Sequence, residues 1–333
     1  MNDLASIPAP GATTQLSGDE AGVAEAARLI RAGACVAFPT ETVYGLGADA
    51  TDAEAVAGIF AAKARPRFNP LIAHLPDRAA AEAEGRFDGF ALRLAEAFWP
   101  GPLTLVVPAA GGTRVCDLAR AGLPSVALRV PSNLLARDLL AAVGRPVAAP
   151  SANRSGRVSP TRADHVLADL DGRIAAVLDG GETPVGVEST VIACLGGPPR
   201  LLRPGGITRA AILSVLGTAL GASAPDDVAR PVGPGLLASH YAPRARLRLD
   251  ATAIEPGEAV LLFGAARPAG IAQALAALNL SPRGDLAEAA ARLFAALRDL
   301  DASGAATIAV SPIPADGLGE AILDRLGRAA APR

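Results

Sequence analysis

Short apolar runs bounded by glycine or proline recur through the first two thirds of the chain. Stretches with helical spacing of apolar residues lie between several of these runs, and this alternation is typical of an α/β or a mixed α+β domain. We therefore expect one sheet domain over residues 15–210, after a loose arm over 1–18. The runs expected to form buried strands are 34–39, 71–75, 103–107, 125–130, 147–150, 174–178 and 190–194.

The last third of the chain has a different pattern. Residues 211–245 contain a stretch rich in proline and glycine with little periodicity, which predicts a linker. Residues 246–333 alternate again and predict a small, Rossmann-like α/β domain of the doubly wound type. Its expected elements are a strand at 259–263, helices at 268–278 and 285–300, a strand at 306–310 and a helix at 319–330.

Composition limits the possible functions. Of the 333 residues 50% are hydrophobic but only 3% aromatic, so alanine, valine and leucine must build the core. The net charge is −2 and both parts of the chain are near neutral, which argues against a basic nucleic-acid platform. Cys35, Cys116 and Cys194 lack the spacing of a zinc site or a disulfide framework. No segment resembles a secretion signal or a membrane span, so we expect a cytoplasmic protein.

Lys63 is the only lysine among 31 lysine and arginine residues. A lysine retained in such a chain is a candidate for a site that needs a compact ammonium and has no room for a planar guanidinium. The surrounding pattern places it near the end of a helix. Thr51 and Glu54 have the spacing of a capping box at its start. Pro66 disfavours helical geometry at Arg65 and should end the helix there.

Lys63 also follows Val56, Ile59 and Phe60 at helical spacing and shares their face. This placement favours a functional role at the rim of an apolar surface over a lysine that merely covers apolar neighbours with its stem. A phosphate-binding P-loop is excluded, because that motif needs a lysine between glycine and serine or threonine. A glycine pattern at 45–50 matches a dinucleotide fingerprint, but the next helix begins too late to meet a pyrophosphate.

Candidate ligand-binding groups occur on a strand and on two loops. Ser125, Ala127 and Arg129 share one face of an alternating strand, where two small residues leave room beside the guanidinium for a carboxylate or phosphate. A structural ion pair is the alternative role for Arg129. The turn-rich loop at 149–161 and the hydroxyl cluster at 187–191 could hold phosphate groups through hydroxyls and backbone N–H groups.

Several segments together, in order and spacing, resemble the YrdC-like threonylcarbamoyl-adenylate synthases. The segments are 38–47, 63–65, 69–72, 99–104, 149–153, 186–190 and 202–205. Residues 234–235 and 239–243 resemble the long form of the family. The resemblance implies a twisted mixed-sheet catalytic domain with a concave cleft over 15–210, a linker and lid over 211–245, and a C-terminal domain over 246–333.

The resemblance also implies a nucleotidyltransferase reaction. L-Threonine, bicarbonate and ATP, with Mg²⁺ bound to the nucleotide, would give threonylcarbamoyl-AMP and pyrophosphate. The product would pass to the proteins that threonylcarbamoylate a tRNA adenosine beside the anticodon. Carbamate formation and adenylation need no protein nucleophile if reactants are aligned and their charge is neutralised. Lys63 and Arg65 would neutralise phosphate charge as the catalytic residues, and no protein side chain is expected to bind the metal.

The family's ligand-binding positions match two groups of residues in this chain. The positions matching threonine contacts are Thr40, His74, Arg129, Ala149 and Ser189. The positions matching nucleotide contacts are Lys63, Arg65, Asn69, Ser125, Ser151, Asn153, Ser159, Arg203 and Leu236.

Two other functions are weighed against this one. A nucleic-acid-binding module could use a positive cleft, but the near-neutral charge and the few aromatics argue against it. A related carbamoyl transferase would make a carbamoyl-adenylate on a different acceptor, although such enzymes usually carry extra domains and cysteine-rich segments. The acceptor requirement separates that enzyme from a threonine-specific one.

Overall fold

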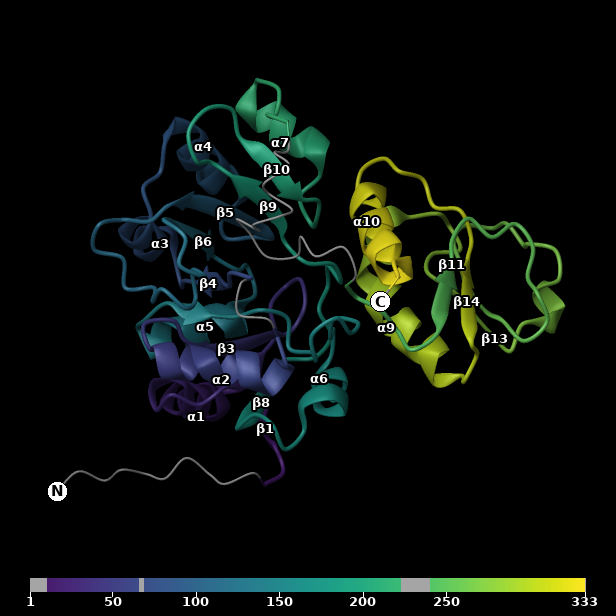
Figure 1. Cartoon of the computed structure of the whole chain (residues 1–333), viewed down its shortest axis with the longest axis horizontal. Helices are drawn as coiled ribbons and strands as arrows, with labels where there is room; N and C mark the ends of the chain where they lie inside the picture. Colours follow the sequence, from purple (N-terminus) through teal and green to yellow (C-terminus); the bar gives the residue numbers. More distant parts are fainter. Residues whose placement is uncertain (1–10, 66–68, 223–239, 333) are drawn as a thin grey trace.

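The structure, a computed structural model, describes residues 11–65, 69–222 and 240–332, which form two α/β domains (Figure 1). The N-terminal domain contains a mixed sheet in the order β1-β8-β2-β3-β7-β4-β6-β5-β9-β10. Its strands are β1 Thr14–Ser17, β2 Val36–Phe38, β3 Gly45–Asp49, β4 Ile72–His74, β5 Leu103–Pro108, β6 Ser125–Arg129, β7 Val147–Ala148, β8 Ala176–Asp179, β9 Thr190–Ala193 and β10 Arg200–Arg203. The expected mixed-sheet domain is therefore confirmed.

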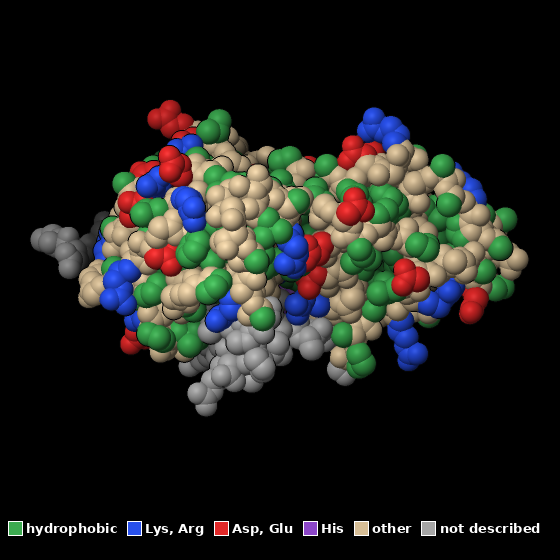
Figure 2. Space-filling model, turned by 90° about the horizontal axis from the view of Figure 1, so that it is seen from above, with side chains coloured by type: hydrophobic (Ala, Val, Ile, Leu, Met, Phe, Trp, Pro, Cys, Tyr) green, Lys and Arg blue, Asp and Glu red, His purple; other side chains and the backbone are tan. Residues whose placement is uncertain are grey.

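The surface carries both signs of charge. On the face seen in Figure 2, arginine side chains are interspersed with aspartate and glutamate, and hydrophobic side chains are scattered between them. None of the described helices has the length and apolar character needed to cross a membrane. Cys35, Cys116 and Cys194 are free thiols, and Cys116 is only half-buried.

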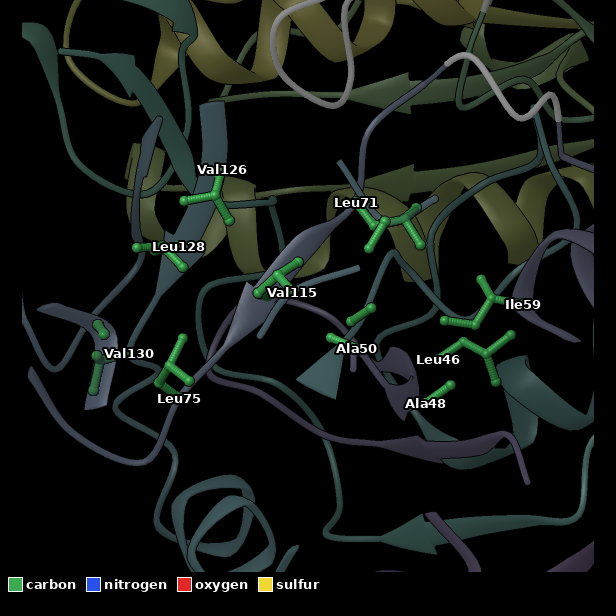
Figure 3. Close-up of a cluster of buried hydrophobic side chains, with 14 of the residues drawn as sticks. Leu46, Ala48, Ala50, Ile59, Leu71, Leu75, Val115, Val126, Leu128 and Val130 are labelled. Carbon is green, nitrogen blue, oxygen red and sulfur yellow. The ribbon is translucent and has the colours of Figure 1, made fainter. Parts of the chain in front are cut away.

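Helices pack on both faces of the N-terminal sheet, because alternate residues of each strand point to opposite sides. Val36 and Phe38 pack with α1 and α5, whereas Ala37 between them packs in the larger cluster on the other face. Figure 3 shows part of this larger cluster, in which Ile59 lies near Leu46. The helices are α1 Glu20–Arg31, α2 Ala53–Lys63, α3 Arg78–Glu84, α4 Gly89–Phe98, α5 Leu134–Val143, α6 Ala163–Leu170 and α7 Arg209–Leu216.

One part of the sheet has no described helix over it. Ile72, Ala127 and Val191 belong to a small buried cluster whose members come from β4, β5, β6, β9 and β10. Their chain neighbours Ala73 and Leu128 pack in the helix-covered cluster on the opposite face. This face of the sheet is therefore buried without a described helix packing on it.

The C-terminal domain has a parallel sheet in the order β11-β14-β12-β13. Its elements are β11 Arg246–Arg248, β12 Ala259–Leu262, the 3-10 helix Ile271–Gln273, β13 Ala276–Asn279, α9 Leu286–Ala302, β14 Thr307–Val310 and α10 Gly319–Ala330. Both helices lie toward the N-terminal domain (Figure 1), and their buried residues form one cluster with Val43, Val158 and Val187 of that domain. The hydrophobic core is thus continuous across the interface.

The helix expected at 268–278 is wrong. The segment forms a 3-10 turn and then β13, which pairs in parallel with β12. Gly270 has φ +79°, and a Cβ there would lie 2.4 Å from the carbonyl oxygen of Ile254, so the chain turns where a helix would have continued. Pairing at the sheet edge then overrides the helix propensity of the alanine-rich run. This turn, rather than a second helical layer, packs on the outer face of the sheet through Ile271.

Other expectations differ in their boundaries. The expected strands form within one or two residues, but β1, β3, β10 and β11 lack long apolar runs and were not expected. The N-cap of α2 is Asp52, whose carboxylate accepts from the Glu54 amide at 2.8 Å, while Thr51 bonds to Asp49 instead. The expected domain boundary at 210 falls inside α7, which packs on α4. Most of the expected linker, including 223–239, lies outside the described residues.

Candidate functional site

A cavity lies beside the part of the N-terminal sheet that has no described helix over it, where Ile72 contributes to the lining, and eight of the expected ligand residues line it. These are Thr40, Arg65, His74, Arg129, Ala149, Ser151, Ser189 and Arg203. The remaining lining residues are Val43, Gly45, Ile72, Pro150, Glu188, His240 and Tyr241. Residues expected to hold threonine and residues expected to hold the nucleotide thus face the same space.

Strand ends bring these side chains together. His74 and Arg129 end the parallel strands β4 and β6 and are register partners. Ser189 precedes β9, and Arg203 ends β10, which is paired with β9. Because neighbouring strands lie about 5 Å apart, this arrangement brings side chains that are distant in sequence together where these strands end or begin.

Arg129 is buried beside Glu41, with 2.8 Å between Nη2 and the carboxylate oxygen Oε1. The contact is close enough for an ion pair, but its direction is poor for hydrogen bonding. Neither carboxylate oxygen of Glu41, nor Nε or Nη2 of Arg129, has a hydrogen-bond partner. Buried polar atoms without partners are costly, so this guanidinium is well placed to bind an anionic ligand. Glu41 lies in the motif at 38–47, but no role is predicted for it from the sequence.

Arg65 and Arg203 supply two more buried guanidiniums. Nε and Nη2 of Arg65 are buried without a hydrogen-bond partner. Burial, together with the charge of Arg203, lowers the pKa of Arg65 to about 10, so the side chain remains cationic at neutral pH. Arg203 instead donates to the carbonyl oxygen of Ser189 at 2.9 Å and to its hydroxyl at 3.1 Å. The Ser189 hydroxyl also lies 2.7 Å from that of Thr104, which fixes its position.

Lys63 is buried but does not line the cavity. Its ammonium donates to the carbonyl oxygens of Ser151 and Asn153, each at 2.5 Å. Burial, and then the nearby charge of Arg65, lower its pKa well below the usual value. The structure therefore places Lys63 beneath a loop that carries two expected nucleotide ligands, and a direct phosphate contact stays a prediction.

Thr40 and His74 have well-defined local partners. The Thr40 hydroxyl donates to the carbonyl oxygen of Val43 at 2.7 Å and accepts from the amides of Thr42 and Val43, so it organises the turn after β2. His74 Nδ1 lies 3.2 Å from the carbonyl oxygen of Ile72, which assigns the proton to Nδ1. Burial, reinforced by Arg129, lowers the pKa of His74 to about 3, so its ring is neutral at physiological pH.

Besides Lys63, four expected nucleotide residues that the structure describes lie outside the cavity lining. Ser159 donates to Glu188 at 2.5 Å, and the Asn153 amide group donates to the carbonyl oxygens of Arg154 and Arg157. Asn69 and Ser125 are buried, and the side-chain oxygens of Asn69 and Asn153 have no partner. Leu236 lies outside the described residues.

Residues without an assigned role also belong to this region. Glu188 lines the cavity and pairs with the fully buried Arg325 of α10 at 2.7 Å. His240 and Tyr241 line the cavity from the segment before β11. A signal for Arg325 exists in the sequence, because it follows Ile322 at helical spacing and precedes Leu326 on the apolar face of α10.

The two domains match two family models. Residues 28–205 match the Sua5, YciO and YrdC model described as telomere recombination, and residues 207–331 match the model described as threonylcarbamoyl-AMP synthase, C-terminal domain. Threonylcarbamoyl-AMP synthase of Bacillus subtilis is 42% identical over 334 residues, covering 96% of each chain. The enzyme of that name from Pyrococcus abyssi is 42% identical over 91% of this chain and 92% of its own.

A solved structure is similar along the same length. The crystal structure of P. abyssi Sua5 complexed with L-threonine superposes with a TM-score of 0.84 at 37% identity, covering 96% of this chain and 97% of that one. Sequence similarity and three-dimensional similarity therefore both extend through the two domains. The chain belongs to the threonylcarbamoyl-AMP synthase family.

Proposed function

We propose that this protein forms threonylcarbamoyl-AMP and pyrophosphate from L-threonine, bicarbonate or CO₂, and ATP. The observation that carries the proposal is the pair of buried guanidiniums of Arg65 and Arg129, which line one cavity and whose Nε and Nη2 atoms lack hydrogen-bond partners. Two such groups suit two anions, a triphosphate and an amino-acid carboxylate. The family membership and the threonine complex of the P. abyssi protein support the same reaction.

Four side chains of the cavity lining have roles in this scheme. Arg129 binds the carboxylate of threonine, and the hydroxyl groups of Thr40 and Ser189 line the same cavity. The amine of threonine attacks CO₂, or bicarbonate with loss of water, to form a carbamate. A carbamate oxygen then attacks the α-phosphorus of ATP, and the bond to the bridging oxygen breaks to release pyrophosphate. Arg65 neutralises the charge on the phosphate groups during this step.

Mg²⁺ enters this scheme with ATP as part of the substrate complex. Among the described residues, no group of three or more histidine, cysteine, aspartate and glutamate side chains could hold a metal ion. The phosphate groups of the bound nucleotide, together with water, would supply the ligands of the metal ion. The mixed anhydride product is reactive, so we further propose that it passes in the cytoplasm to the proteins that modify tRNA.

The test is an assay of pyrophosphate release from ATP, with mass detection of threonylcarbamoyl-AMP. Release should require both threonine and bicarbonate. Arg65→Met should reduce it at least 100-fold, whereas Arg86→Met, at an exposed arginine outside the cavity lining, should leave it unchanged. Release that does not depend on threonine would instead support a carbamoyl transferase with another acceptor. Salt-dependent RNA binding without ATP turnover would support a nucleic-acid-binding module.

A further inference from the structure

Arg325 is an unusual residue because it is charged, belongs to the C-terminal domain and is completely buried (0% exposed). Its guanidinium is fully engaged. Nε donates to Glu188 at 2.7 Å, Nη1 to Asp324 at 2.6 Å and Nη2 to the carbonyl oxygen of Pro204 at 3.0 Å. The planar group also lies over the ring of Tyr241, 5.2 Å from its centre.

The partners of Arg325 are adjacent to the cavity. Glu188 lines it directly and precedes Ser189, while Pro204 follows Arg203. The second carboxylate oxygen of Glu188 accepts from the hydroxyl of Ser159. Through one side chain, the C-terminal domain thus holds the loop before β9 and the end of β10, and it reaches Ser159 through Glu188.

Other contacts of the C-terminal domain restrain the same loops. Gly186 packs so closely on α9 that a Cβ there would lie 2.3 Å from the carbonyl oxygen of Ala290. Val187 is buried in the cluster that α9 and α10 form. Arg298 of α9 donates to the carbonyl oxygen of Val158, next to Ser159, at 2.5 Å. These contacts leave the loops little freedom to change position independently of the C-terminal domain.

The positive charge of Arg325 keeps the buried carboxyl group of Glu188 ionised. Burial opposes ionisation of Glu188, but Arg325 and then Arg203 outweigh it and lower the carboxyl pKa below its usual value. A buried carboxylate deprived of its ion-pair partner must move, take up a proton or admit water. Each of these responses would displace Ser159 or Ser189, because both are tied to the Glu188 segment.

We propose that Arg325 is a positioning residue through which the C-terminal domain sets the geometry of the threonine and ATP site. The inference rests on the proposed function, because it concerns the site of that reaction. Arg325 touches neither substrate and acts through Glu188 and the Pro204 carbonyl. In this chain the C-terminal domain is therefore a structural part of the active site.

A matched control is a second ion pair between the domains that also involves α10. Arg209 of α7 pairs with Glu320 of α10 at 2.5 Å, so it also joins the two domains. Its side chain is half exposed, and neither partner lines the cavity. If the contacts only held the domains together, Arg325→Met and Arg209→Gln would change the KM values alike. If Arg325 positions the site, only Arg325→Met should change them strongly.

The first experiment measures KM for threonine and ATP, kcat and thermal unfolding for both variants, at a temperature where each is fully folded. Arg325→Met should raise at least one KM tenfold or more, and Arg209→Gln should change either KM less than twofold. Arg325→Lys, which keeps one charged contact to Glu188, should give an intermediate KM. Unchanged KM values in Arg325→Met overturn the inference. If Arg325→Met does not fold, unchanged KM values in Arg325→Lys overturn it.

A double-mutant cycle with Glu188→Gln provides a second test. The neutral amide no longer needs a counter-charge, so Arg325→Met should add less than threefold to the loss already caused by Glu188→Gln. Fully multiplicative losses would mean that Arg325 does not act through Glu188. The wild-type assay separates the two hypotheses. An inactive wild type counts against the proposed function, whereas an active wild type with an unchanged Arg325→Met counts against the inference alone.

Discussion

The ammonium nitrogen of Lys63 lies 2.5 Å from the carbonyl oxygen of Asn153, inside the protein and beneath the loop that follows β7. The same nitrogen is 2.5 Å from the carbonyl oxygen of Ser151. A compact ammonium can donate to two converging carbonyl groups, whereas a planar guanidinium presents its donors in a wider, fixed fork. This geometry gives a physical reason why the position holds lysine in a chain whose other basic side chains are arginine.

Replacing Lys63 should therefore disturb the loop as well as the chemistry. Lys63→Ala leaves two buried carbonyl groups without their donor, which should lower the free energy of unfolding by about 2–3 kcal/mol and abolish adenylate formation. Lys63→Arg should also be inactive, because the larger group does not fit. Arg173→Ala is the control, since Arg173 is exposed and contacts the same helix end through the carbonyl oxygen of Ala62. Full activity in Lys63→Ala would contradict the role given to this residue.

Arg129 should determine the affinity for the amino-acid substrate. Arg129→Lys keeps a positive charge beside Glu41 but loses the planar, two-pronged donor. We expect KM for threonine to rise at least tenfold while KM for ATP changes less than threefold. Arg129→Met should in addition lower the free energy of unfolding by about 3 kcal/mol, because it leaves the buried Glu41 carboxylate unpaired. Equal effects on both KM values would argue against a specific threonine contact.

Stability should fall as the pH drops below about 6.5, the ordinary histidine pKa. Burial lowers the pKa of His74 and His240 to about 3 and that of His165 to about 4. Between these values and 6.5 the unfolded chain binds protons that the folded chain does not, so protonation favours unfolding. Each histidine contributes up to about 1.4 kcal/mol per pH unit. Urea unfolding at pH 7, 6 and 5 measures the slope.

The matched variant for this prediction is His165→Gln, because His165 does not line the cavity. It should remove about a third of the pH dependence between pH 7 and 5, where carboxyl groups still contribute little. A slope identical to that of the wild type would show that His165 takes up its proton equally in the folded and the unfolded protein, which would contradict the prediction.

Gly186 should tolerate no side chain. Its φ is +74° and a Cβ would meet the backbone of α9, so Gly186→Ala combines backbone strain with a clash at the domain interface. We expect the free energy of unfolding to fall by more than about 3 kcal/mol, or the domains to shift apart. Gly172 has a similar φ of +70° with open space beside it, so Gly172→Ala should cost only about 1 kcal/mol of strain. Thermal unfolding of both variants measures the difference.

The sequence alone was enough to predict the main elements of the fold. Apolar runs and helical spacing identified most of the strands and helices, because burial on a sheet or helix face imposes a period that survives in the sequence. The short strands β1 and β11 were missed, since they pair with β8 and β14, which are distant in the chain. The helix predicted at 268–278 was wrong, because pairing of β13 with β12 at the sheet edge outweighed the helix propensity of the alanines.

The motifs of the chain were also enough to predict which residue types the site contains, including Thr40, Arg129 and Ser189. How these groups are held in place depends on the folded chain and could not be predicted from the motifs. Lys63 and Arg325 each sit on the apolar face of a helix, but helical spacing cannot show what lies opposite a helix. The carbonyl groups that hold Lys63 and the carboxylate that pairs with Arg325 come from segments 88 to 137 residues away in the chain. Such contacts form only when the whole chain has folded, because their energy depends on burial that no local segment provides.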